Sequence, residues 1–85
     1  MRALFVGGTV DNSELDVDLD GSEPSTHYPE NGGSGQSRYH LHHTGVRDGN
    51  VVYAVYAAPD SDDGDVQRIA DERQYARRFG VDAAN

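Results

Sequence analysis

The segment "VVYAVYAA" (51–58) constrains the fold more than any other part of this sequence. β-Branched and aromatic residues favour strands, and both alternating faces of the segment are apolar, one carrying Tyr53 and the other Tyr56. A strand of this kind lies in the centre of a sheet or is covered on both sides. We therefore expect a sheet built around residues 51–58, with one face packed by this chain and the other needing a further cover, such as a neighbouring subunit.

Three more segments have strand character. Residues 3–6 are a short apolar run ended by two glycines, and residues 14–20, "ELDVDLD", alternate acidic and apolar side chains with period two. Such alternation is typical of an antiparallel strand with one wet face. Residues 37–46 form the third segment, in which alternation places Tyr39, Leu41 and His43 on one face and Arg38, His40 and His42 on the other. The intervening "RDGN" (47–50) predicts a hairpin turn, because Asp-Gly tolerates positive φ.

The remaining periodic segment predicts a helix over residues 65–79. Apolar side chains recur there near one stripe, the acids at 60–65 suit a helix N-terminus, and Gly80 is suited to ending the helix. The fold class is therefore α+β, a small, mostly antiparallel four-stranded sheet (β-β-β-β) with a C-terminal helix. We expect a single domain over residues 1–80, with a long flexible loop at 21–36 and a tail at 81–85.

Composition limits the classes of function. Apolar residues make up 35% of the 85 residues, below the ~45–50% of ordinary domains, and without cysteine no disulfide can supply stability. The formal net charge of −8 repels nucleic acid and anionic membranes, so neither is expected as a partner. All cations are Arg, and such an acidic, lysine-free composition suits either a halophilic source or a GC-rich genome. No apolar run reaches the length of a membrane span, and no signal peptide opens the sequence.

The acidic stretch admits a second interpretation as a calcium loop. Asp16, Asp18, Asp20 and Gly21 match the first half of an EF-hand-type loop. The bidentate Glu of the twelfth position is replaced by His27, and a strand would spread the three Asp side chains along about 13 Å. The strand interpretation is therefore preferred, and a cation (Ca²⁺)-binding module remains the alternative.

The histidines offer a second possible metal site. His40 and His42 share a strand face at a spacing that zinc and iron sites in β-barrels use, and His27 or an Asp could add a ligand. The pair alone is more typical of ordinary strand residues, and His43 reads as an interior histidine. No phosphate loop and no nucleophile elbow is present, so neither a cofactor nor an enzymatic activity is expected.

Tyrosines are candidates for partner contacts, since this residue is enriched at protein interfaces. Tyr28 in the long loop and Tyr75 on the helix have no evident place in the core. Together with the apolar strand, the candidate interface residues are Tyr28, Tyr75, Val52, Tyr53 and Tyr56.

Two stretches, "ALFVGGTVDNSELDV" and "YHLHHTGVRDGNVVYAVYA", resemble a group of small proteins of tailed viruses. These phage-like proteins open with a strand ending in Gly-Gly, usually Gly-Gly-Pro-x-Asp-Gly, and close with a Tyr-rich strand pair. Gly7, Gly8 and Asp11 match, whereas Thr9 and Asn12 replace the usual Pro and Gly. The later half is matched by Tyr39, Leu41, Val52, Tyr53 and Tyr56. Most such proteins have no assigned activity, so the resemblance implies no catalytic residue.

The expected function is therefore that of a non-enzymatic structural protein of a tailed-virus particle, a capsid-associated, decoration or head–tail connector component. It would be made in the host cytoplasm, reside in the virion and contact other virion proteins in a symmetric assembly. The composition favours a virus of a halophilic archaeon, with an actinobacterial phage as the other option. Besides the cation-binding module, the open alternative is a non-virion accessory protein that binds a host or viral protein.

Overall fold

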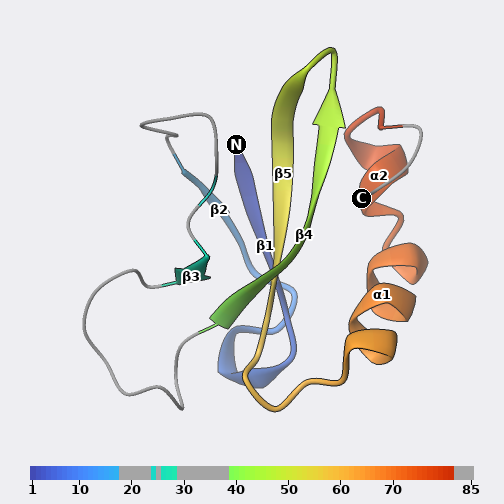
Figure 1. Cartoon of the computed structure of the whole chain (residues 1–85). Helices are drawn as coiled ribbons and strands as arrows, with labels where there is room; N and C mark the ends of the chain where they lie inside the picture. Colours follow the sequence, from blue (N-terminus) through green and yellow to red (C-terminus); the bar gives the residue numbers. More distant parts are fainter. Residues whose placement is uncertain (18–23, 25, 29–38, 82–85) are drawn as a thin grey trace.

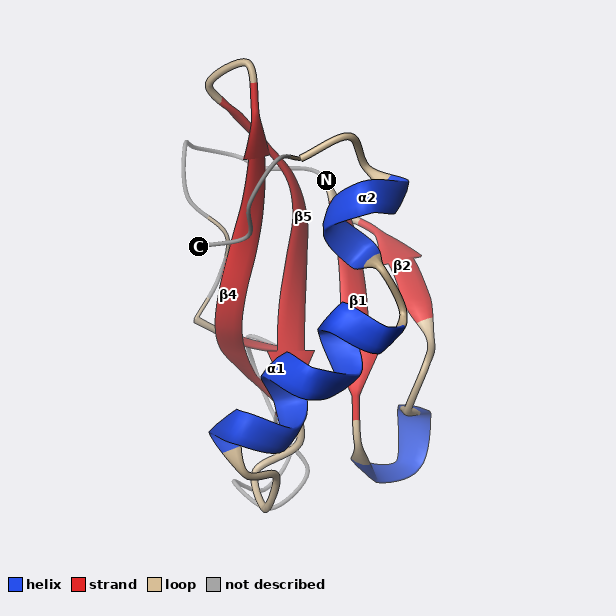
Figure 2. Ribbon diagram, turned by 90° about the vertical axis from the view of Figure 1, so that its right-hand side faces the viewer, coloured by secondary structure: helices blue, strands red, loops and turns tan. Residues whose placement is uncertain are grey.

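The computed structural model describes residues 1–17, 24, 26–28 and 39–81. They form one sheet with strand order β2-β1-β5-β4-β3 and two helices that lie on one of its faces (Figures 1 and 2). The central strands β1 (Arg2–Val6) and β5 (Asn50–Ala57) run parallel, and every other pairing is antiparallel. The α+β class with a mostly antiparallel sheet is confirmed.

The outer strands differ from their predicted bounds. β2 spans Glu14–Asp16, and a hydrogen bond from Val17 N to Met1 O (2.9 Å) extends its pairing by one residue. Residues 18–20 of the predicted strand lie outside the described part of the chain. β3 (His27–Tyr28) is a fifth strand within the segment expected to be loop. Its two residues carry no periodic pattern, so only pairing with β4 defines it.

β4 (Tyr39–Arg47) and β5 are joined by the predicted hairpin turn. Asp48 has φ 53° and Gly49 has φ 81°, the left-handed pair that a two-residue turn requires. The β4 register shifts between Leu41, which pairs with Tyr56, and His43, which pairs with Val55. His42 is the extra residue of a β-bulge, and a bulge re-aims the side chains that follow it.

The predicted single helix is two helices, α1 (Asp63–Glu72) and α2 (Tyr75–Arg78). The acidic N-cap is confirmed, because the Asp62 carboxylate accepts hydrogen bonds from Gly64 N (3.0 Å) and Asp65 N (3.3 Å). α1 ends before Gln74, whose backbone is left-handed (φ 58°). A 3-10 turn, η1 (Gly8–Val10), links β1 to the segment before β2.

Both faces of β5 are buried from Tyr53 to Ala57, as its composition predicted. The helix face forms one cluster, made of Leu4, Val6, Tyr53, Val55, Ala57, Val66, Ala70, Tyr75 and Val81. The opposite face forms a second cluster, made of Ala3, Phe5, Tyr39, Ala54, Tyr56 and Ala58. On this second face Ala54 is 0% and Tyr56 2% exposed in the single chain. No neighbouring subunit is needed to cover it, contrary to our expectation.

Candidate functional site

Three of the candidate contact residues lie in the core. Tyr53, Tyr56 and Tyr75 are each at most 2% exposed. Tyr75 follows the break between α1 and α2, packs at 6.3 Å between ring centroids against Tyr53, and accepts a hydrogen bond from Arg73 Nη1 (3.1 Å). The break changes the helical phase, so the Tyr75 side chain points into the core. The interpretation of Tyr75 as a surface contact was therefore wrong. These tyrosines serve packing in this chain.

The other two candidate contact residues, Val52 and Tyr28, lie outside the centre of the core. Val52 is partly buried against the helix-face cluster. Tyr28 belongs to β3, where it pairs with Tyr39, but its side chain is outside the described part of the structure. The tyrosine-based interface predicted from sequence therefore does not come together as one surface.

The acidic strand faces arginines of its own chain. Asp16 lies opposite Arg2 in the β1–β2 pairing, with 2.7 Å between Asp16 Oδ1 and Arg2 Nε. Glu14 contacts Arg2 Nη1 (3.3 Å) and also Arg78 Nη2 of α2 (2.9 Å). Of the proposed calcium ligands, Asp16 is thus engaged by Arg2, and Asp18 and Asp20 lie outside the described residues.

The Gly7–Gly8 turn is fastened by Asp11. One Asp11 oxygen accepts from Gly7 N (2.8 Å), and both accept from Arg73 Nη2 (3.0 and 3.1 Å). The Gly7 hydrogen bond, with Arg73 beside it, holds the pKa of Asp11 below its ordinary value of 3.8 against the opposing effect of burial. This carboxylate therefore holds the turn to the helix region and is not available as a general base.

Tyr39 completes the same turn from β4. Its hydroxyl donates to Gly7 O (2.6 Å) and accepts from Val10 N (3.1 Å). A Cβ at Gly8 would lie 2.5 Å from this hydroxyl, and Gly8 has φ 69°, so the position suits glycine alone. The resemblance to tailed-virus proteins rests in part on Gly7, Gly8 and Asp11. In this structure these three residues form and stabilise the turn after β1.

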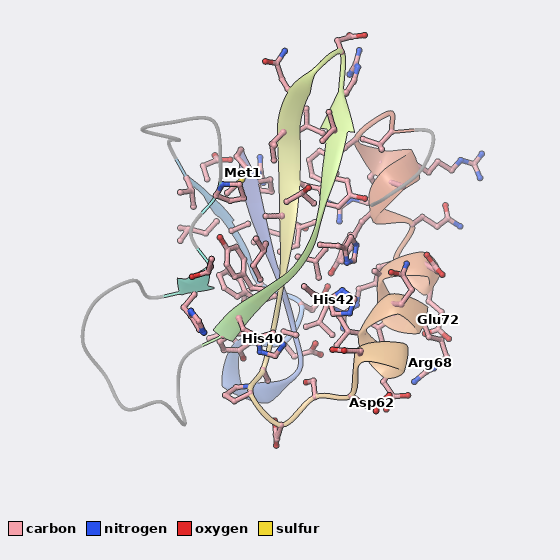
Figure 3. The ribbon with its side chains drawn as sticks, in the orientation of Figure 1. Met1, His40, His42, Asp62, Arg68 and Glu72 are labelled. Atoms are coloured by element: carbon pink, nitrogen blue, oxygen red, sulfur yellow. The ribbon has the colours of Figure 1, made fainter. Side chains whose placement is uncertain are left out.

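The β4 bulge brings two neighbouring histidines to the helix face. Figure 3 shows His42 between β4 and the start of α1, where its Nε2 lies 3.8 Å from Asp63 Oδ1 and its Nδ1 lies 2.6 Å from His43 Nδ1. His43 was expected beside Leu41 on the opposite face. The expected face was wrong, because a prediction from strict alternation does not account for the extra residue of a bulge. His43 is nevertheless interior as predicted, being 8% exposed.

His43 and Tyr53 form a buried polar pair beneath α1. Their rings contact at 6.4 Å between centroids, and neither His43 Nε2 nor the Tyr53 hydroxyl has a hydrogen-bond partner within the described structure. Burial lowers the pKa of His43, with His42 adding to the effect and Asp71 opposing it. Burial also raises the pKa of Tyr53. Since both side chains are shielded from solvent, this pair has no access to a substrate.

The β4–β5 hairpin projects beyond the rest of the sheet (Figures 1 and 2). β1 pairs with β5 only from Tyr53 to Ala57, and β3 pairs with β4 only at Tyr39 and His40. Residues 46–51 are here named the hairpin arm. In the described part of the chain, the two strands of this arm pair only with each other and with no third strand. Val46 on this arm is 40% exposed, opposite Val51. Sequence reasoning missed the arm, although the strand at 51–58 exceeds the one at 3–6 in length.

Comparison with known proteins found no matching family model, no similar curated protein and no similar solved structure. Within the described residues, no group of three or more His, Cys, Asp or Glu side chains is placed to hold a metal ion. No helix in the same residues is long and apolar enough to cross a membrane.

Proposed function

We propose that this chain is a non-enzymatic structural protein of a tailed-virus particle, a capsid-associated, decoration or head–tail connector component that acts through protein–protein contacts. The hairpin arm is the observation that carries the proposal. It extends past the sheet, exposes Val46 at 40%, and ends in the charged pair Arg47 and Asp48. Val46, with the half-buried Val51 opposite it and the charges beside it, suits a contact with a small apolar centre and a polar rim.

The placement of Asp11 and His43 supports a role without catalysis. Asp11 is bound by Gly7 and Arg73, and His43 is buried. Asp11 stabilises the turn after β1, and His43 is packed in the core. The proposal therefore rests on the surface of the hairpin arm and not on reactive side chains. The partners are other virion proteins, and the symmetric assembly, the virion location and synthesis in the host cytoplasm belong to the same proposal.

Mass spectrometry of purified particles tests the proposal, with the chain expected among the virion proteins. Val46→Asp on the arm should lower the amount of protein incorporated, whereas Val10→Asp, at a valine that is 42% exposed on η1, should not. Both variants should melt like the wild type, because neither valine is in the core.

Absence of the wild-type chain from particles would sink the virion role. A pull-down from infected cells then separates the alternatives. Specific capture of a host or viral protein, weakened by Val46→Asp, would favour the accessory protein. A melting midpoint that rises with Ca²⁺ in low salt would favour the cation-binding module.

A further inference from the structure

His27 and His40 lie on the same face at one end of the sheet. His40 pairs with Ala57 of the helix-face cluster, so its side chain points to the helix side. His27 of β3 lies directly opposite His40, and residues directly opposite in antiparallel strands share a face. The sequence places His27 and His40 thirteen residues apart, and only the β3–β4 pairing brings them together.

The hydrogen bonding around this pair fixes its geometry. Leu41 N donates to Thr26 O (2.8 Å), so the bond joins the residues flanking His27 and His40 and not these two themselves. The pair is therefore of the non-hydrogen-bonded kind, in which side chains approach most closely, with Cβ atoms about 4.5–5.5 Å apart. Two imidazoles at this separation can reach one ion.

We propose that His27 and His40 together bind one divalent transition-metal ion of the imidazole-preferring class, such as Zn²⁺, with water completing its coordination. Zinc accepts imidazole nitrogens at about 2.0–2.1 Å. His27 is exposed and its Nδ1 lies 3.2 Å from Thr26 Oγ1, which leaves Nε2 free to turn toward His40. The net charge of −8 raises the local concentration of cations.

The neighbouring pair His42 and His43 does not suit the same ion. Its two Nδ1 atoms are 2.6 Å apart, whereas two nitrogens on one tetrahedral zinc ion lie about 3.3 Å apart when each bond is near 2.05 Å. His43 is also 8% exposed, so it is largely shielded from the water that would complete the coordination of the ion. The metal site is thus the cross-strand pair, and it holds the two-residue β3 against β4.

Titration of the whole chain with ZnCl₂, followed by NMR of the histidine ring protons, tests the site. We expect saturable shifts of His27 and His40, and a binding constant weakened at least about tenfold, or 1.4 kcal/mol, by His27→Ala or His40→Ala. His42→Ala is the matched control and should bind zinc like the wild type. Melting curves without metal verify that each variant is folded.

Two results would overturn the site. If CaCl₂ at equal concentration produced the same shifts, the effect would be general attraction of cations to acidic side chains, since Ca²⁺ prefers oxygen ligands. If His42→Ala abolished binding while His27→Ala did not, the ion would belong to the His42–His43 pair.

Discussion

Gly45 lies against the ring of Tyr53, one of the two buried tyrosines in the helix-face cluster. A Cβ at this position would come 2.0 Å from Tyr53 Cε2 and 2.4 Å from its Cζ. Tyr53 is 0% exposed and is packed by Tyr75 and Phe79, so the ring has nowhere to move. The size of one residue in β4 therefore decides whether a tyrosine fits in β5.

Gly45→Ala should lower the free energy of unfolding by about 3 kcal/mol, as expected for overpacking without room to relax. Urea unfolding followed by circular dichroism measures the loss. The control is Gly49→Asn in the hairpin turn, where a Cβ meets nothing within 4 Å and Asn tolerates the left-handed backbone. A loss of less than about 0.5 kcal/mol for Gly45→Ala would mean that the Tyr53 ring is mobile.

His43 makes stability depend on pH. Its folded-state pKa is lowered from 6.5, mainly by burial, so the unfolded chain takes up this proton first as the pH falls. The contribution of neutral His43 is fully present above about pH 6.5 and is lost as pH falls toward the folded-state pKa. His42 and Asp71 are the titratable neighbours whose charges act on it.

The free energy of unfolding should therefore fall between pH 7.5 and pH 5.5, by at most about 1.4 kcal/mol per pH unit for one proton. Urea titrations at several pH values measure this slope. His43→Leu should flatten it, because leucine binds no proton in either state. A slope that persists in His43→Leu would assign the proton uptake to another group. Asp11 does not interfere, since its pKa lies below 3.8.

The position at which α1 ends and α2 begins is determined by contacts of Arg73 with other elements. Arg73, at the end of α1, donates to Asp11 beyond η1, to Phe5 O of β1 and to Tyr75 of α2. These contacts turn the chain at Gln74, which adopts φ 58° and ψ 41°. Helical periodicity runs through this point in the sequence, so the break follows from tertiary contacts and not from local preference.

Gln74→Gly should raise the free energy of unfolding by about 0.5–1 kcal/mol, since a left-handed backbone costs a non-glycine residue about 1–2 kcal/mol and glycine very little. Thermal or urea unfolding measures the gain. Gln67→Gly within α1 is the matched control and should be destabilising by about 1 kcal/mol. Destabilisation by Gln74→Gly would mean that α1 and α2 are continuous in solution.

The whole molecule carries fifteen acidic residues against seven arginines. Several arginines are paired within the chain, including Arg2 with Asp16, Arg73 with Asp11 and Arg78 with Glu14. These pairs are partly exposed, so each contributes little, and the excess of carboxylates leaves a net repulsion. Glu14 and Asp16 of β2 thus pair with arginines of their own chain.

Salt should stabilise this protein. Raising NaCl from about 0.05 M to about 1 M shortens the screening length to about 3 Å, which relieves the repulsion of a chain with net charge −8. The melting midpoint should rise, as differential scanning calorimetry would measure. A fall in the midpoint would show that the arginine–carboxylate pairs outweigh the repulsion, and would count against a halophilic source.

Residue patterns predicted the central strand, the Asp-Gly turn and the acidic N-cap correctly, because each depends on neighbours within a few positions. Local residue patterns did not predict the hairpin arm as the candidate interface. Three of the four tyrosines proposed for contacts, Tyr53, Tyr56 and Tyr75, are buried. The exposed hairpin arm depends on how far β1 extends along β5. Burial and edge exposure are properties of the assembled sheet.

By itself the sequence determined that residues 51–58 form a strand covered on both faces, since alternating apolar side chains allow no wet side. Only the tertiary structure decided where the β4 bulge places His43, that β3 sets His27 opposite His40, and which arginines meet Glu14 and Asp16. The physical reason is strand register: one inserted residue changes the face of the side chains that follow, and register is fixed by contacts between distant segments.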